Sequence, residues 1–183
     1  MSTDVDRPTL AAIAVVAFAL ANLAHEGMGH GGACLLAGGR ALALSAIHFD
    51  GDLGGLGPAA GKWVAAGGTL GNLVLGLLAW VALRASRGAP GPARVFLWLS
   101  MTVNLLQAAG YWLFSGLGGI GDWAEVIGGW KPHWAFRLGL TALGGTRLTT
   151  TGIPGFPVDP SAPAAAARSE TRPPRRECAA PVR

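Results

Sequence analysis

Charged residues and cysteines are both scarce in this chain, and each scarcity excludes a class of protein. Acidic and basic residues make up 13% of the 183 positions, about half of what a soluble globular domain carries. No basic stripe is interleaved with aromatic residues, so nucleic acid is not expected as a partner. The two cysteines, Cys34 and Cys178, form neither a CxxC metal motif nor a disulfide framework.

The N-terminus also lacks the basic region that opens a secretory signal peptide. Residues 1–8 include Asp4, Asp6 and Arg7. A small-residue cleavage site would fall inside the polar motif at residues 25–30. We therefore expect the first apolar run to be a retained membrane segment.

Apolar residues and glycine are abundant instead. Hydrophobic residues account for 51% of the chain, the mean hydropathy is +0.42, and 29 residues are glycine. This composition is typical of a membrane protein whose helices approach through small residues. Residues 10–29, 63–83 and 95–114 each have the length of about 20 residues that crosses a hydrocarbon core of about 30 Å. Residues 134–145 are a shorter fourth candidate.

The predicted fold is therefore all-α: a polytopic membrane helix bundle with three or four spans. Residues 1–145 form the membrane-embedded domain. Residues 146–183, rich in proline, alanine and arginine, form a disordered tail. Between the first two spans we expect a short helix, an extended segment at 41–48 and a polar turn at 48–52, where glycines continue the loop.

Three ionisable residues interrupt the end of the first apolar run: His25, Glu26 and His30. Imidazoles are good zinc ligands, and an adjacent carboxylate can take a proton from a metal-bound water. In a regular α-helix, however, His25 and His30 point about 140° apart. A π-bulge would bring these two residues onto one face, whereas an α-helix would instead pair Glu26 with His30. A polar helix end without a metal is the third reading.

Two further polar residues are candidates for the same site. Asp122 follows a glycine-rich passage and is either a third metal ligand or the N-cap of a helix, with Glu125 three positions later. Asn72 is the strongly polar residue of the second span. It is either an interhelical hydrogen-bonding group or a substrate-facing amide.

Three passages together resemble the site-2 protease family of intramembrane zinc metalloproteases and its related bacterial members. Residues 25–30 (HEGMGH) with 35–40 (LLAGGR) look like that family's first-helix motif and the turn after it. Residues 68–73 (GTLGNL) are similar to its helix with a Gly-Pro-x-x-Asn element. Gly121 and Asp122 stand where the family's Leu-Asp-Gly motif supplies an aspartate to zinc.

The resemblance implies a zinc metalloprotease that hydrolyses peptide bonds in or near the bilayer. Carried over, it makes His25, His30 and Asp122 the zinc ligands and Glu26 the general base. Asn72, the polar residue of the second span, is assigned to substrate binding. The partners of the protease would be membrane lipids and a membrane-protein or peptide substrate. Its location would be a bacterial inner membrane, crossed several times. The alternative is an inactive scaffold or regulator of the same fold, with or without bound metal or haem.

Overall fold

The computed structural model describes residues 5–86 and 91–150, with side chains as far as residue 146. These residues are mostly helical and include one two-stranded sheet. The chain divides into two units, Met1–Thr151 and Gly152–Arg183. The second unit, and with it nearly all of the predicted tail, lies outside the described residues.

The first helical stretch changes its hydrogen-bonding pattern along its length. It consists of α1 (Arg7–Leu23), the π-helix η1 (Ala24–Gly31) and α2 (Gly32–Leu36), which follow one another without a break. The side chain of Asp6 caps α1 by accepting a hydrogen bond of 2.8 Å from the backbone N–H of Thr9.

The outer surface of α1 is made of large apolar side chains. Val15 and Phe18 are exposed, whereas the residues of α1 that are buried are the small Ala17 and Ala21. Large groups therefore point away from the bundle and small ones toward it. This is the arrangement that membrane helices use to pack closely.

A β-hairpin follows the first helical stretch. Strands β1 (Arg40–Leu44) and β2 (Phe49–Asp52) pair antiparallel, and their ends are joined by an ion pair of 2.6 Å between Arg40 and Asp52. The predicted extended segment is therefore present in part. The polar turn predicted at 48–52 is wrong, because β2 occupies residues 49–52.

The hairpin also corrects the all-α fold class, since the chain is mostly helical rather than wholly so. An extended segment leaves backbone N–H and C=O groups without partners, and a second strand supplies them. The side chains of Leu44 and Phe49 lie over η1. A Cβ atom added to Gly27 would meet Leu44 at 3.3 Å, and one added to Gly31 would meet Phe49 at the same distance.

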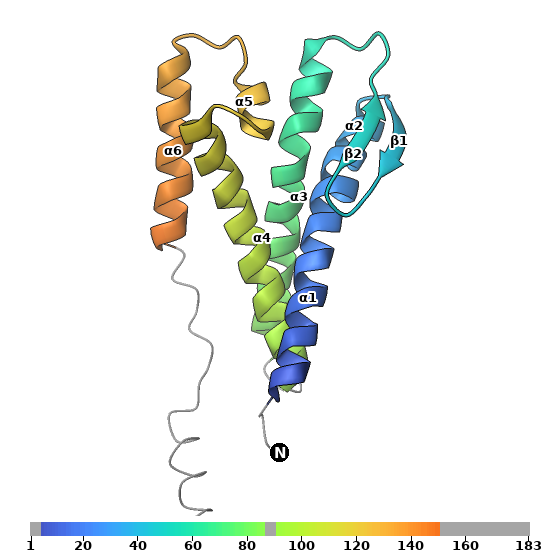
Figure 1. Ribbon diagram of the computed structural model, residues 1–183, viewed down its shortest axis with the longest axis vertical. Helices are drawn as coiled ribbons and strands as arrows, with labels where there is room; N and C mark the ends of the chain where they lie inside the picture. The colour runs from blue at the N-terminus through green and yellow to red at the C-terminus, as the bar shows by residue number, and fades with distance from the viewer. Residues whose placement is uncertain (1–4, 87–90, 151–183) are drawn as a thin grey trace, which may run out of the picture. The chain divides into compact units, whose positions relative to one another are not determined.

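Helix α3 (Pro58–Ala85) packs against η1 and against α4 (Gly91–Gly118), and α4 also packs against α1 (Figure 1). The contact between η1 and α3 is made by backbone. A Cβ atom added to Gly29 would lie 2.6 Å from the carbonyl oxygen of Gly67 and from the Cα of Gly68. The predicted helix contact through small residues is therefore confirmed here.

The short helix α5 (Asp122–Val126) docks on α3, as seen near one end of the bundle in Figure 1. Its Val126 joins a buried apolar cluster with Ala65 and Ala66, against which Trp123 packs. The indole N–H of Trp123 also donates a hydrogen bond of 2.8 Å to Thr69 Oγ1. These contacts fix α5 beside the N-terminal half of α3.

The last helix, α6 (His133–Thr150), packs along α4. It continues past the domain boundary predicted at residue 145. By length and composition, two stretches of the described chain are long and apolar enough to cross a membrane, and they are Arg7–Leu36 and Pro58–Ala85.

Candidate metal centre

The π-helix η1 brings the two histidines of the motif onto one face. A π-helix bonds each residue to the fifth one along, so positions i and i+5 are stacked. The rings of His25 and His30 accordingly lie edge to face with their centroids 4.8 Å apart. Of the two geometries left open by the sequence, the π-helical one is confirmed. Glu26 stays close as well, because one ligand atom from each of the three residues lies within 4.8 Å of the others.

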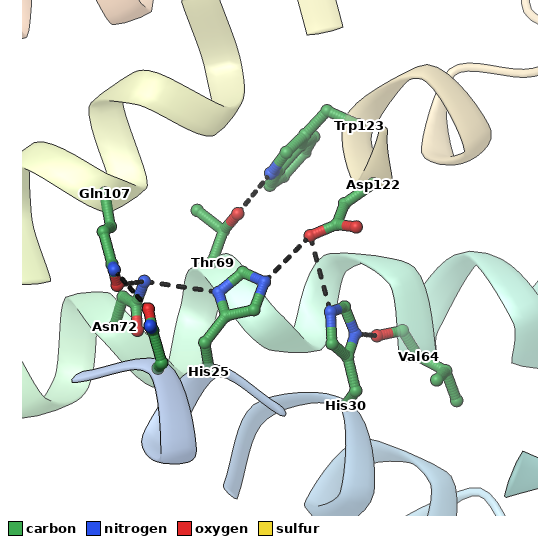
Figure 2. Close-up of polar contacts among 9 residues, drawn as sticks. His25, His30, Val64, Thr69, Asn72, Gln107, Asp122 and Trp123 are labelled. Atoms are coloured by element: carbon green, nitrogen blue, oxygen red, sulfur yellow. Dashed lines mark hydrogen bonds and ion pairs between the residues drawn. The ribbon is translucent and has the colours of Figure 1, made fainter. Parts of the chain in front are cut away.

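Asp122 reaches this pair from the start of α5. Its Oδ2 atom lies 3.3 Å from Nε2 of His25 and 3.5 Å from Nε2 of His30 (Figure 2). The N-cap of α5 is Gly121, with φ of 85°, and no side chain caps the helix. The structure therefore points the Asp122 side chain at the histidines and not at the helix terminus.

The distances between Asp122 Oδ2 and the two imidazole Nε2 atoms fit a metal ion bound among them. Oδ2 of Asp122 is buried, and its polar neighbours among the described residues are the two imidazole Nε2 atoms. Zinc–nitrogen distances of about 2.0–2.1 Å and zinc–oxygen distances of about 2.0–2.2 Å place tetrahedral ligand atoms about 3.3–3.5 Å apart. Both contacts of Oδ2 have this length. Two imidazoles and one carboxylate are also a usual protein ligand set for catalytic zinc.

The hydrogen bond at Nδ1 of His30 determines which ring nitrogen keeps a lone pair. Nδ1 lies 2.7 Å from the carbonyl oxygen of Val64. A carbonyl only accepts, so Nδ1 carries the proton and a neutral ring presents the lone pair of Nε2 to Asp122. Two electron-rich atoms then face each other unless a cation lies between them.

Asp122 supplies the negative charge of the site. Burial by itself opposes ionisation, but the imidazoles of His25 and His30 outweigh burial and lower the pKa of Asp122 to about 2. The carboxyl group is therefore anionic at neutral pH, as a metal ligand must be.

Two features of the site were not predicted as functional. The backbone of Gly68 lies against both imidazoles, and a Cβ atom there would be 2.5 Å from Nε2 of His25 and 2.6 Å from Nε2 of His30. The ring of Tyr111 stacks on His25, with centroids 4.3 Å apart and planes inclined by 16°. The paired glycines at 67 and 68 were a usable signal for the first feature, whereas the sequence holds no signal for the second.

Asn72 contacts the Nδ1 atom of His25 and not the Nε2 atom that faces Asp122. Its side chain is fully buried, and Nδ2 is 3.2 Å from Nδ1 of His25 and 2.9 Å from Oε1 of Gln107. Of the two roles considered for Asn72, this arrangement matches interhelical hydrogen bonding. It gives no support to the predicted contact with substrate.

A cavity of about 440 Å³ opens on the ligand residues. It is bounded by the hairpin, α3, α4 and α5. The side chains with ionisable groups that line it are those of His25, Glu26, His30, His48, Tyr111, Asp122 and Glu125. Asn72 does not line it. Both imidazoles and the Asp122 carboxylate therefore line one cavity.

The fold and the site together define a mostly helical protein with a candidate metal centre between a π-helix and a short docked helix. The chain was compared with protein-family models, curated proteins and solved structures, and none of them matches it.

Proposed function

We propose that this protein is an intramembrane zinc metalloprotease with His25, His30 and Asp122 as its zinc ligands. The observation that carries the proposal is the position of Asp122 Oδ2, 3.3 Å and 3.5 Å from the two imidazole Nε2 atoms. These separations match the edges of a zinc-centred tetrahedron. The resemblance of residues 25–30 to the first-helix motif of site-2 proteases supports the same assignment.

The membrane setting is part of the proposal. Arg7–Leu36 and Pro58–Ala85 have the length and apolar character of spans. We assign α4 as a third span and α6 as a fourth in a polytopic bundle of a bacterial inner membrane. The inside of the protein supports this assignment, because its largest fully buried side chains include the polar Asn72, Asn104 and Thr69, while large apolar groups are exposed. Apolar surroundings can tolerate that exposure.

The mechanism assigns one task to each residue at the cavity. When bound, zinc supplies Lewis-acid chemistry that polarises a carbonyl group and acidifies a water ligand. Glu26 lines the cavity beside the histidines. Its carboxylate accepts the proton of the attacking water and then delivers it to the nitrogen of the departing amine. The substrate is a peptide segment in or near the bilayer that enters the cavity in extended form.

Metal content gives the first test. The full chain purified in detergent is expected to bind one zinc ion per molecule by elemental analysis. Asp122→Ala removes the ligand oxygen and should abolish this binding. Glu125→Ala is the matched control, because Glu125 is a second cavity carboxylate on the same short helix and should leave zinc in place. Equal zinc in both variants would contradict the ligand assignment.

Peptide-bond cleavage gives the second test. The zinc-bound chain is incubated with fluorescently labelled casein as a general unfolded substrate and with a labelled transmembrane peptide in the same micelles. Cleavage that stops with a zinc chelator and returns with added zinc supports the protease. Stoichiometric zinc with neither substrate cleaved would favour the inactive scaffold or regulator.

A further inference from the structure

Behind the candidate metal centre, three side-chain amides extend from His25 in one chain of hydrogen bonds (Figure 2). Nδ2 of Asn72 contacts both Nδ1 of His25 and Oε1 of Gln107. Nε2 of Gln107 in turn donates a hydrogen bond of 2.7 Å to Oδ1 of Asn22. The amides come from three different helices, α3, α4 and α1, so the chain ties the bundle together at His25.

The direction of this chain sets the tautomer of His25. Because the NH₂ group of Asn72 donates to Nδ1, that nitrogen carries no proton, and the neutral ring holds its proton on Nε2. Nε2 is the atom that faces Asp122 at 3.3 Å. A protonated Nε2 has no lone pair for a metal, so this direction belongs to the metal-free protein.

Metal binding through Nε2 demands the other tautomer. The proton then sits on Nδ1 and needs an acceptor, which a metal-ligating histidine nearly always has. A rotation of 180° exchanges the oxygen and nitrogen of an amide in place. After it, His25 Nδ1 and Gln107 Nε2 both donate to the Asn72 oxygen, whose two lone pairs suit two donors. Asn22 then donates to Gln107.

Either direction of the amide chain leaves one buried amide atom of Asn72 without a hydrogen-bond partner among the described residues. Oδ1 of Asn72 is buried without a hydrogen-bond partner among the described residues. After rotation Nδ2 takes the same place, so the number of unpartnered atoms in this amide does not change. The choice of direction is therefore left to what Nε2 of His25 faces, a carboxylate alone or a cation.

We propose that Asn22, Gln107 and Asn72 form a reversible amide chain that selects the tautomer of His25. Asn72 donates a hydrogen bond to Nδ1 of His25 when the metal is absent, and it accepts one from Nδ1 when the metal is bound. The inference rests on the proposed metal site and makes Asn72 a positioning residue. His30 needs no such device, because the Val64 carbonyl only accepts and keeps Nε2 of His30 available in both states.

Zinc affinity of the full chain in detergent tests the chain of amides, measured by competition with a chromophoric chelator. Asn72→Leu leaves the Nδ1 proton of His25 without an acceptor and should weaken zinc binding by about 10- to 100-fold. Asn72→Asp keeps an acceptor that receives hydrogen bonds from His25 and Gln107, and it should retain the affinity. Asn104→Leu is the control, a buried amide of α4 that donates to the Ser100 carbonyl away from this chain.

Equal losses for Asn72→Leu and Asn72→Asp, or no loss for either, would overturn the proposal. A second measurement needs no variant. Nitrogen-15 NMR of the histidine-labelled chain at fixed pH should find the His25 proton on Nε2 without zinc and on Nδ1 with zinc. The same tautomer in both states also overturns the proposal. Failure of the proposed function is read separately, from a wild-type chain that binds no zinc.

Discussion

The carboxylate of Glu26 is the one group of the HEGMGH motif that the proposed site leaves free for proton transfer. Both imidazoles have their Nε2 atoms turned to Asp122, and His30 has its Nδ1 hydrogen-bonded to Val64. Glu26 lines the cavity within 4.8 Å of the imidazole ligand atoms. Because the Asp122 carboxylate faces both Nε2 atoms, the proposal leaves the Glu26 carboxylate to act as the base.

Glu26→Gln tests this division of roles. The amide keeps the size of the side chain but cannot accept the proton, so peptide-bond cleavage should fall by about 10²- to 10⁴-fold. Zinc content should stay at the wild-type level. The measurement is turnover per bound zinc on the substrate that the wild type cleaves. Undiminished turnover would exclude Glu26 as the base.

Sequence reasoning could single out the residues proposed as ligands, but it could not place them relative to one another. The types and order of His25, Glu26 and His30 indicate metal chemistry by themselves. Asp122 lies far along the chain, and its capping motif was an equally good explanation. Its true environment depends on the docking of Trp123 and Val126 onto α3, a tertiary contact that no local pattern encodes.

At the scale of the element, the π-helix η1 brings His25 and His30, which are five positions apart, onto one face of the helix. The extra residue between the histidines would separate them on an α-helix, and the π pattern absorbs it. Glycines at 27, 29 and 31 leave room for the hairpin on one side of η1 and for α3 on the other. The strand pairing of β1 with β2 was missed because residues 49–52 carry turn-forming glycine and aspartate.

Gly68→Ala tests the close approach of α3 to the imidazoles. The added methyl group would lie 2.5 Å from His25 and 2.6 Å from His30, so both rings must move and zinc binding should be lost. Gly139→Ala on α6 is the control, because nothing lies within 4 Å of a Cβ atom there and alanine favours a helix. The measurement is zinc per folded molecule. Zinc retained by Gly68→Ala would mean that the imidazoles do not need this backbone contact.

At the scale of the whole molecule, the distribution of polar and apolar residues supports the proposed membrane setting. Amides, hydroxyl groups and histidine are buried between the helices, while leucine, valine and phenylalanine are exposed around them. The low charge and abundant glycine of the sequence lead to the same membrane prediction, and the structure adds two helical stretches of membrane-spanning length and hydropathy. Two stretches of the described chain have the length and hydropathy of spans, and the proposed total of four depends on the assignment of α4 and α6.

Alkaline extraction tests the membrane assignment. With apolar helices inserted in the bilayer, the full chain should stay in the membrane pellet at high pH and dissolve only with detergent. A control variant that carries three arginines at exposed positions of α1, namely Val15, Val16 and Phe18, should lose stable insertion. Release of the wild type into the alkaline supernatant would remove the membrane setting from the proposal.

X-ray absorption at the zinc edge measures the arrangement of the two imidazoles and the aspartate most directly. For the zinc-bound chain, we predict four nitrogen or oxygen neighbours at about 2.0–2.2 Å. Two of them should show the scattering of imidazole rings, and Asp122→Ala should lose an oxygen neighbour or the zinc itself. A zinc environment without imidazole, or one that Asp122→Ala leaves unchanged, would contradict the proposal that His25, His30 and Asp122 hold one metal ion.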